Sequence, residues 1–233
     1  MSTIAANMQA VEATIAAATG AAGRPQSSVQ LLAVSKTFPM EAVLEAMAAG
    51  QRAFGENYLQ EGVEKIAAVA RAQPDTAVEW HFIGPIQSNK TRPIATSFAW
   101  VHTVERLKIA QRLSEQRPPE MGPLNVCLQV NISGEATKSG VTPAELPELA
   151  RQVAALPNLK LRGLMAIPEA QTDPALQRAA FARLRVLAES LRAGGLAIDT
   201  LSMGMSGDMA AAIAEGATIV RVGSAIFGAR HYD

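Results

Sequence analysis

The chain has 233 residues, of which 48% are hydrophobic and 18% charged, and its formal net charge is zero. This length suits one large domain or two small ones, and the apolar content excludes a disordered chain. Zero net charge argues against nucleic-acid or membrane-surface binding by bulk electrostatics, and no apolar run is long enough to span a bilayer. The single cysteine, Cys127, excludes internal disulfides and fits a reducing compartment, so we expect a cytoplasmic protein.

The chain begins with a predicted helix and continues with eight predicted strands. Residues 1–20, MSTIAANMQAVEATIAAATG, contain Glu12 and no basic residue, which indicates a helix and not a signal peptide. Short apolar runs follow at residues 29–36, 53–57, 79–85, 99–104, 125–131, 159–167, 200–206 and 218–228. Most of them are apolar on both faces, which is typical of parallel strands covered on both sides.

Helical patterns separate several of these runs. Residues 39–50 begin with Pro39 and end at Gly50, and residues 142–158 open with Thr142 as the expected cap and Pro143 just inside the helix. Residues 173–195 carry an apolar stripe with helical spacing, and residues 206–216 form a short alanine-rich segment that ends in a glycine.

This alternation predicts a (β/α)₈ TIM barrel that occupies residues 1–233 as a single domain, with an extra N-terminal helix. A doubly wound open sheet is the alternative. It would place ligand chemistry at a switch point in the middle of the sheet, and no GxGxxG motif follows the first strand.

In a barrel of this kind the site lies at the C-terminal ends of the strands. Ser206 and Gly207 follow the seventh run, and Gly223 and Ser224 follow the eighth. Small residues and helix-start N–H groups at this pair of strands are typical of a phosphate site. Either loop alone would be read as a simple turn, but both together favour phosphate binding.

Lys36 ends the first strand, which is the neighbour of the eighth strand in a closed barrel. In an apolar cavity the neutral amine of a lysine is favoured and can attack a carbonyl. Pyridoxal 5′-phosphate (PLP) combines an aldehyde, an aromatic ring and a phosphate, and Arg221 could face its ring nitrogen. The alternative is an ion-paired or snorkelling Lys36.

The remaining polar and sulfur-bearing residues carry weaker signals. Cys127 lies in the apolar run NVCLQV and is expected to be a buried structural thiol. His102 and His231 have no metal-ligand partners at useful spacing, so no metal is predicted. Residues 86–90, IQSNK, could bind an anion at the rim, although a solvated helix start is favoured.

Five segments of the sequence resemble the pyridoxal phosphate homeostasis protein family, and they occur in the expected order from about residue 29 to Arg230. They are AVSKT, FGENYLQE, WHFIGPIQSNK, GLMAIP and LSMGMSGDM with RVGSAIFGAR. The resemblance implies a single barrel similar to the N-terminal domain of bacterial alanine racemase, with a fold-type-III-like PLP site. It implies a Schiff base at Lys36, and it assigns the phosphate and the ring to two further sets of residues: Ser206, Gly223 and Ser224 for the phosphate, and Asn57, His81, Met203 and Arg221 for the ring. His81 also fits a core histidine satisfied by hydrogen bonds, and Ala210 departs from the acidic residue expected there.

The resemblance implies a PLP carrier or regulator of PLP and amino-acid pools, without efficient catalysis. Its expected partners are PLP and PLP-dependent apoenzymes as acceptors, and the expected state is a monomer. Two alternatives stay open. One is a PLP-dependent racemase, and the other is a phosphosugar-type barrel enzyme without a cofactor.

Overall fold

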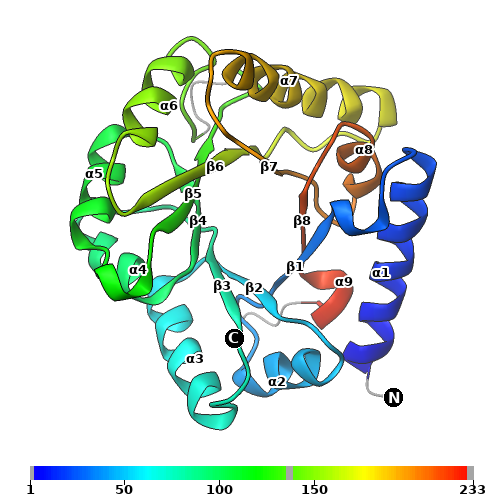
Figure 1. The fold of residues 1–233 in the computed structure, drawn as a ribbon. Helices are drawn as coiled ribbons and strands as arrows, with labels where there is room; N and C mark the ends of the chain where they lie inside the picture. Colours follow the sequence, from blue (N-terminus) through cyan, green and yellow to red (C-terminus); the bar gives the residue numbers. More distant parts are fainter. Residues whose placement is uncertain (1–2, 135–138, 230–233) are drawn as a thin grey trace.

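The computed structural model describes residues 3–134 and 139–229. All strands are parallel and close a barrel in chain order, with β1 paired to both β2 and β8 (Figure 1). The strands are β1 Gln30–Val34, β2 Ala53–Glu56, β3 Glu79–Phe82, β4 Trp100–Val104, β5 Leu124–Gln129, β6 Leu159–Met165, β7 Thr200–Ser202 and β8 Ile219–Val222. The predicted (β/α)₈ barrel is therefore confirmed.

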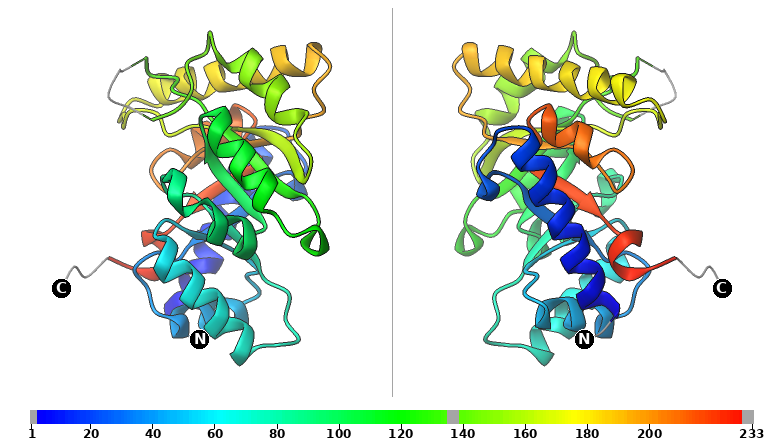
Figure 2. Two further views of the ribbon diagram at one scale, coloured as in Figure 1. Left: turned by 90° about the vertical axis from the view of Figure 1, so that its left-hand side faces the viewer. Right: turned by 90° about the vertical axis from the view of Figure 1, so that its right-hand side faces the viewer.

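Helices surround the barrel on its outer side, and an additional helix precedes β1, as predicted (Figures 1 and 2). The helices are α1 Thr3–Ala21, α2 Met40–Ala48, α3 Leu59–Ala72, α4 Thr91–Ser97, α5 Leu107–Gln116, α6 Leu146–Ala154, α7 Pro174–Ala193, α8 Met209–Ala214 and α9 Ser224–Phe227. Among the described helices none is long and apolar enough to cross a membrane.

Apolar side chains pack in two places. The larger cluster fills the space between the strands and the helices, and the smaller one lies among the strands and includes Leu32, Trp100, Cys127 and Met165. Cys127 is fully buried, as predicted, and burial raises the pKa of its thiol to about 12. A thiol with that pKa stays protonated at neutral pH and is a poor nucleophile.

The helix α1 lies beside the last two helices of the chain (Figure 1). Its Asn7 Nδ2 donates to the carbonyl of Ile226 in α9 (2.9 Å), and Arg24, just after α1, donates to the carbonyl of Ile213 in α8 (2.7 Å). The helix α9 has only four residues, so α1 covers part of the barrel wall that a longer final helix would cover.

Two helices begin later than the sequence patterns indicate. The helix α6 begins at Leu146 and not at Pro143, because Pro147 is tolerated only in a first turn. Thr142 still accepts a hydrogen bond, from the N–H of Glu145 (3.3 Å), in the turn before the helix. The helix α8 begins at Met209, so residues 206–208 form a turn.

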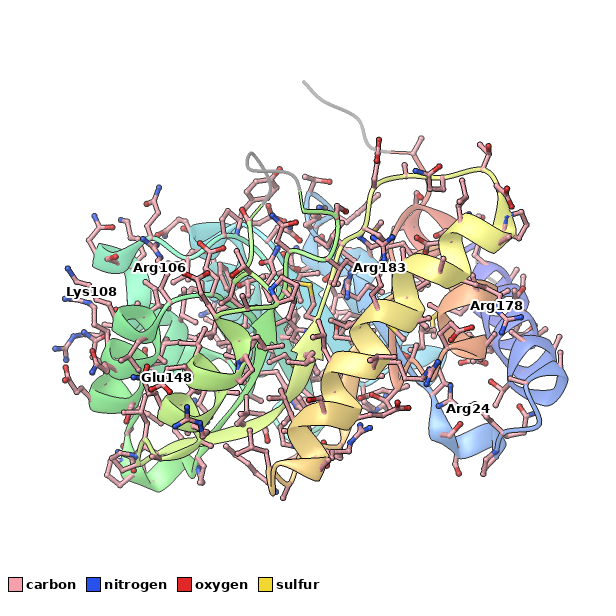
Figure 3. The ribbon with its side chains drawn as sticks, turned by 90° about the horizontal axis from the view of Figure 1, so that it is seen from above. Arg24, Arg106, Lys108, Glu148, Arg178 and Arg183 are labelled. Atoms are coloured by element: carbon pink, nitrogen blue, oxygen red, sulfur yellow. The ribbon has the colours of Figure 1, made fainter. Side chains whose placement is uncertain are left out.

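Ion pairs and hydrogen bonds fix the long helix α7 to its neighbours (Figure 3). Arg178 pairs with Glu215, just after α8 (2.8 Å), and Arg183 donates to the carbonyl of Ile132 in the loop after β5 (3.3 Å). These contacts join α7 to elements on both of its sides.

Candidate functional site

Lys36 lies in the turn directly after β1, at the C-terminal end of the barrel, and it is half-buried. The next residue, Thr37, has a φ of 68°, in the left-handed region that a β-branched residue rarely adopts. This conformation costs about 1–2 kcal/mol, so the surrounding contacts must hold the turn in place.

A buried charged cluster beneath this turn holds the backbone on both sides of Lys36. Lys65 Nζ, from α3, donates to the carbonyl of Ser35 (2.8 Å) and to the carboxylates of Glu56 (2.7 Å) and Glu61 (2.8 Å). Ser35 Oγ donates to Glu56 (2.6 Å), and the N–H of Thr37 donates to Glu61 (2.7 Å). Glu56 is fully buried, and burial raises the pKa of its carboxyl although Lys65 opposes this shift.

The loops after β7 and β8 lie beside the end of β1. Ala33 pairs with Val222 in the barrel, and a Cβ on Gly223 would approach the carbonyl oxygen of Val34 to 3.2 Å. The N–H of Arg221 donates to the carbonyl of Gly204 (2.9 Å), which brings the two loops together. The structure therefore gathers both glycine- and serine-containing loops next to the turn that carries Lys36.

Within these loops the predicted phosphate residues are accessible. Ser206 and Ser224 are exposed, and Gly223 is half-buried. Met203, which precedes the first loop, is fully buried. The hydroxyl groups of Ser206 and Ser224 thus belong to exposed residues on one rim of the barrel.

Arg221 is buried inside the barrel and is held by the last residue of β7 and by the residue that follows β6. Its Nη1 donates to the carbonyl oxygen and to Oγ of Ser202 (both 2.8 Å), and its Nη2 donates to the carbonyl of Ala166 (3.1 Å). Burial lowers the pKa of Arg221 to about 10, so the guanidinium remains charged at neutral pH.

Asn57 follows β2 at the same end of the barrel. Its buried Oδ1 has no hydrogen-bond partner among residues 3–134 and 139–229. The backbone packs tightly here, because a Cβ on Gly84 would lie 2.0 Å from the carbonyl oxygen of Asn57. Asn57 borders a cleft of about 450 Å³ whose polar lining also includes Thr103, Glu105, Arg106, Gln129 and Ser139.

His81 is fully buried, and both of its ring nitrogens are engaged. Nε2 lies 2.9 Å from Glu79, and Nδ1 lies 2.9 Å from Nε2 of His102. His81 is therefore a satisfied interior histidine, and its contact with a ligand ring stays a prediction.

The structure adds residues that the sequence patterns did not identify as site residues: Glu56, Lys65, Glu79, His102 and Ser202. The i, i+4 spacing of Glu61 and Lys65 is visible as a pairing signal in the sequence. Residues 88–90 form a turn before α4 in which Asn89 and Lys90 are exposed, as the solvated interpretation predicts, whereas Ile86 at the start of the segment is buried. Within the described ranges, no three His, Cys, Asp or Glu side chains are grouped to hold a metal ion.

The chain is similar to proteins of one family over its whole length. The sequence profile described as "Alanine racemase, N-terminal domain" matches residues 6–231. The chain is 64% identical to the pyridoxal phosphate homeostasis protein of Pseudomonas aeruginosa, over 100% of this chain and 98% of that protein. It is 53% identical to the protein of the same name from Escherichia coli, over 100% and 99% of the two chains.

The chain is also similar to solved structures of this family and of this fold. PipY of Synechococcus elongatus, solved with PLP bound, has a TM-score of 0.83 and 38% identity, and the match covers 97% of this chain and 100% of PipY. An alanine racemase from Corynebacterium glutamicum shares the fold at a TM-score of 0.69 and 18% identity, over 99% of this chain and 62% of the racemase. The chain therefore belongs to the alanine racemase N-terminal domain family and, within it, to the pyridoxal phosphate homeostasis proteins.

Proposed function

We propose that this protein binds PLP at the C-terminal end of its barrel and acts in PLP homeostasis as a carrier or regulator. The observation that supports this function best is the meeting of Lys36 with the loops after β7 and β8, fixed by the pairing of Ala33 with Val222 and by the approach of Gly223 to Val34. The related PipY has been solved with PLP bound.

The residues present fit this cofactor. Gly223 leaves space where a side chain would press against β1, and the unpartnered buried Oδ1 of Asn57 suits a group that meets a ligand. PLP, when bound, supplies an aldehyde for a lysine and an electron-withdrawing ring. Lys36 would form the Schiff base, and Arg221 would face the ring nitrogen.

The phosphate would lie at the rim formed by Ser206, Gly223 and Ser224. Charged hydrogen bonds of this kind contribute about 1.5–3 kcal/mol each. Met203 and Asn57 would border the ring. Arg221 can only donate hydrogen bonds, so it favours an unprotonated ring nitrogen.

The decisive experiment is borohydride reduction of the PLP-loaded protein followed by peptide mass analysis. We expect the phosphopyridoxyl group on Lys36 and loss of the PLP absorbance in Lys36→Ala. Lys160→Ala, which removes an exposed lysine of β6, is the matched control and should bind PLP normally. A phosphopyridoxyl group found only on another lysine would refute the assignment.

We further propose that the protein lacks efficient racemase activity. Racemisation needs an acid or base on each face of the substrate, and Lys36 can serve one face. Tyr58 is 52% exposed at the start of α3 and borders a cleft with Pro85, Ile86 and Lys90. Tyr232, the other tyrosine, lies outside the described residues.

Incubation of the PLP-loaded protein with L-alanine should form D-alanine at a rate far below the roughly 1 per second of ordinary enzymes. Faster turnover would favour the racemase alternative.

A further inference from the structure

Four side chains connect Arg221 to the opposite end of the barrel. Arg221 Nη1 donates to Ser202 Oγ (2.8 Å), which lies 2.7 Å from Nδ1 of His102. Nε2 of His102 lies 2.9 Å from Nδ1 of His81, whose Nε2 lies 2.9 Å from a carboxylate oxygen of Glu79. The chain of contacts therefore passes through β8, β7, β4 and β3 in turn.

Arg221 and Glu79, the two ends of this series of contacts, fix the direction of every hydrogen bond between them. Arg221 can only donate, and the hydrogen bond from His81 lowers the pKa of Glu79 to about 2, so its ionised carboxylate can only accept. Ser202 Oγ must then use its one proton toward His102. Both histidines carry their proton on Nε2 and accept a hydrogen bond at Nδ1.

The histidines are neutral in this arrangement. Both are fully buried, and burial lowers the pKa of His81 and, more strongly, that of His102. The reverse direction would place the lone pair of a neutral His81 Nε2 against the Glu79 carboxylate. One arrangement of protons therefore satisfies all five groups.

Packing holds these hydrogen-bonded side chains in place. The His81 ring stacks on Trp100 with centroids 5.3 Å apart and an interplanar angle of 7°. The guanidinium of Arg162 lies 4.6 Å above the Trp100 ring from another side of the barrel. Gln30 Nε2 donates to Glu79 (3.2 Å) and fixes the carboxylate.

We propose that Ser202, His102, His81 and Glu79 are positioning residues that hold the Arg221 guanidinium in one orientation toward the ring nitrogen of PLP. The proposal rests on the PLP site described above. Contacts with Ser202 and Ala166 use three of the five N–H groups of Arg221. Within residues 3–134 and 139–229, the Nε–H and the second Nη2–H make no such contact and remain for a ligand, so the anchoring decides which groups the ligand meets.

Nitrogen NMR of the cofactor-free protein tests the arrangement without PLP. At neutral pH, His81 and His102 should both appear neutral with the proton on Nε2. Ser202→Ala removes the hydroxyl and keeps the carbonyl contact to Arg221, and Glu79→Leu removes the final acceptor. Each should increase proton exchange at Arg221 Nη1, the nitrogen that donates to Ser202, about tenfold, the effect of losing one hydrogen bond of about 1.4 kcal/mol.

Two further variants separate positioning from general destabilisation. Glu79→Gln keeps an acceptor for His81 and should restore wild-type exchange. Glu12→Leu removes another carboxylate that borders the same cavity as Glu79 but does not belong to this series of contacts. Proton exchange at Arg221 should therefore stay at the wild-type level in this variant. If Ser202→Ala does not fold, the Glu79 variants decide alone, because Glu79 is 41% exposed at the barrel end.

PLP carrying a nitrogen label in its ring then reports on the ligand. Ser202→Ala and Glu79→Leu should shift the ring-nitrogen resonance and raise the Kd for PLP about three- to tenfold, with Glu79→Gln close to wild type. Wild-type exchange and wild-type Kd in both disruptive variants would overturn the proposal, as would a histidine protonated on both nitrogens. A wild-type protein that fails to bind PLP would instead refute the proposed function, and the exchange data would still decide the anchoring of Arg221.

Discussion

At the scale of single residues, the support beneath Lys36 is a buried ion pair. Lys65 and Glu56 have side-chain exposures of 4% and 0%. Removing one member of such a pair leaves an uncompensated buried charge, which is strongly destabilising. The pair also holds Ser35, so its loss should affect the position of Lys36.

We expect Lys65→Met to lower the free energy of unfolding by about 3–5 kcal/mol, measured by urea denaturation. The double variant Lys65→Met/Glu56→Gln should recover part of this loss, because the amide carries no charge. Lys160→Met, at an exposed position, should stay within about 0.5 kcal/mol of wild type. A loss below about 1 kcal/mol in Lys65→Met would contradict the described role of the pair.

The sequence predicts some of these residues and not others. Lys36 and Arg221 are recognisable because a charged residue in an apolar strand is unusual. The pairing of His102 with His81 and Ser202 is not recognisable, since these partners lie 21 and 100 residues away in the chain. Such pairings depend on how the barrel closes and leave no local spacing signal.

At the scale of elements, the connection after β3 constrains the site most tightly. Gly84 lies against the backbone of Asn57, and Thr103 Oγ1 in β4 donates to the Gly84 carbonyl (2.6 Å). A side chain at position 84 would push this connection away from β2. Asn57 would move with it.

Gly84→Ala is expected to lower the free energy of unfolding by at least about 1–3 kcal/mol, because the new methyl group meets rigid backbone. Thermal or urea unfolding measures the effect. The matched control is Gly20→Ala near the end of α1, where a Cβ would meet only Gln26 Nε2 at 3.8 Å. A Gly84→Ala protein as stable as wild type would show that this connection can shift freely.

The order and type of the elements follow from the sequence, whereas their ends do not. The alternation of apolar runs and helical patterns identified the barrel correctly. The start of α6 was wrong because Pro147 outweighed the Thr142 and Pro143 signal. Predicted strands in the last quarter also extended beyond β7 and β8, since Met203 and Gly204 are apolar or small but lie in a loop.

At the scale of the whole molecule, the buried histidines make stability depend on pH. The unfolded chain binds protons at His81 and His102 below about 6.5, whereas burial lowers the pKa of both in the folded protein. Stability is therefore complete above this pH and is lost as the pH falls toward the lowered pKa values. Glu56 acts in the opposite sense, because its pKa is raised in the folded protein.

We expect the free energy of unfolding to fall below pH 6.5 by about 1.4 kcal/mol per pH unit for each buried histidine. Urea denaturation from neutral pH down to about pH 5 measures this slope. The double variant His81→Gln/His102→Gln removes both titrating groups and isolates their contribution from that of Glu56. An equal slope in wild type and double variant would mean that the histidines are not the cause.

The contacts of α1 have a consequence for synthesis. Met8, Val11 and Ile15 are buried in the finished protein, where α1 packs beside α8 and α9. A ribosome makes these residues about 200 positions before the helices that cover them. Helix α1 therefore waits, with the part of its apolar face that α8 and α9 contact uncovered, until these two helices have emerged. Chaperones that shield nascent apolar segments should bind α1 during this interval and release it when β8 closes the barrel.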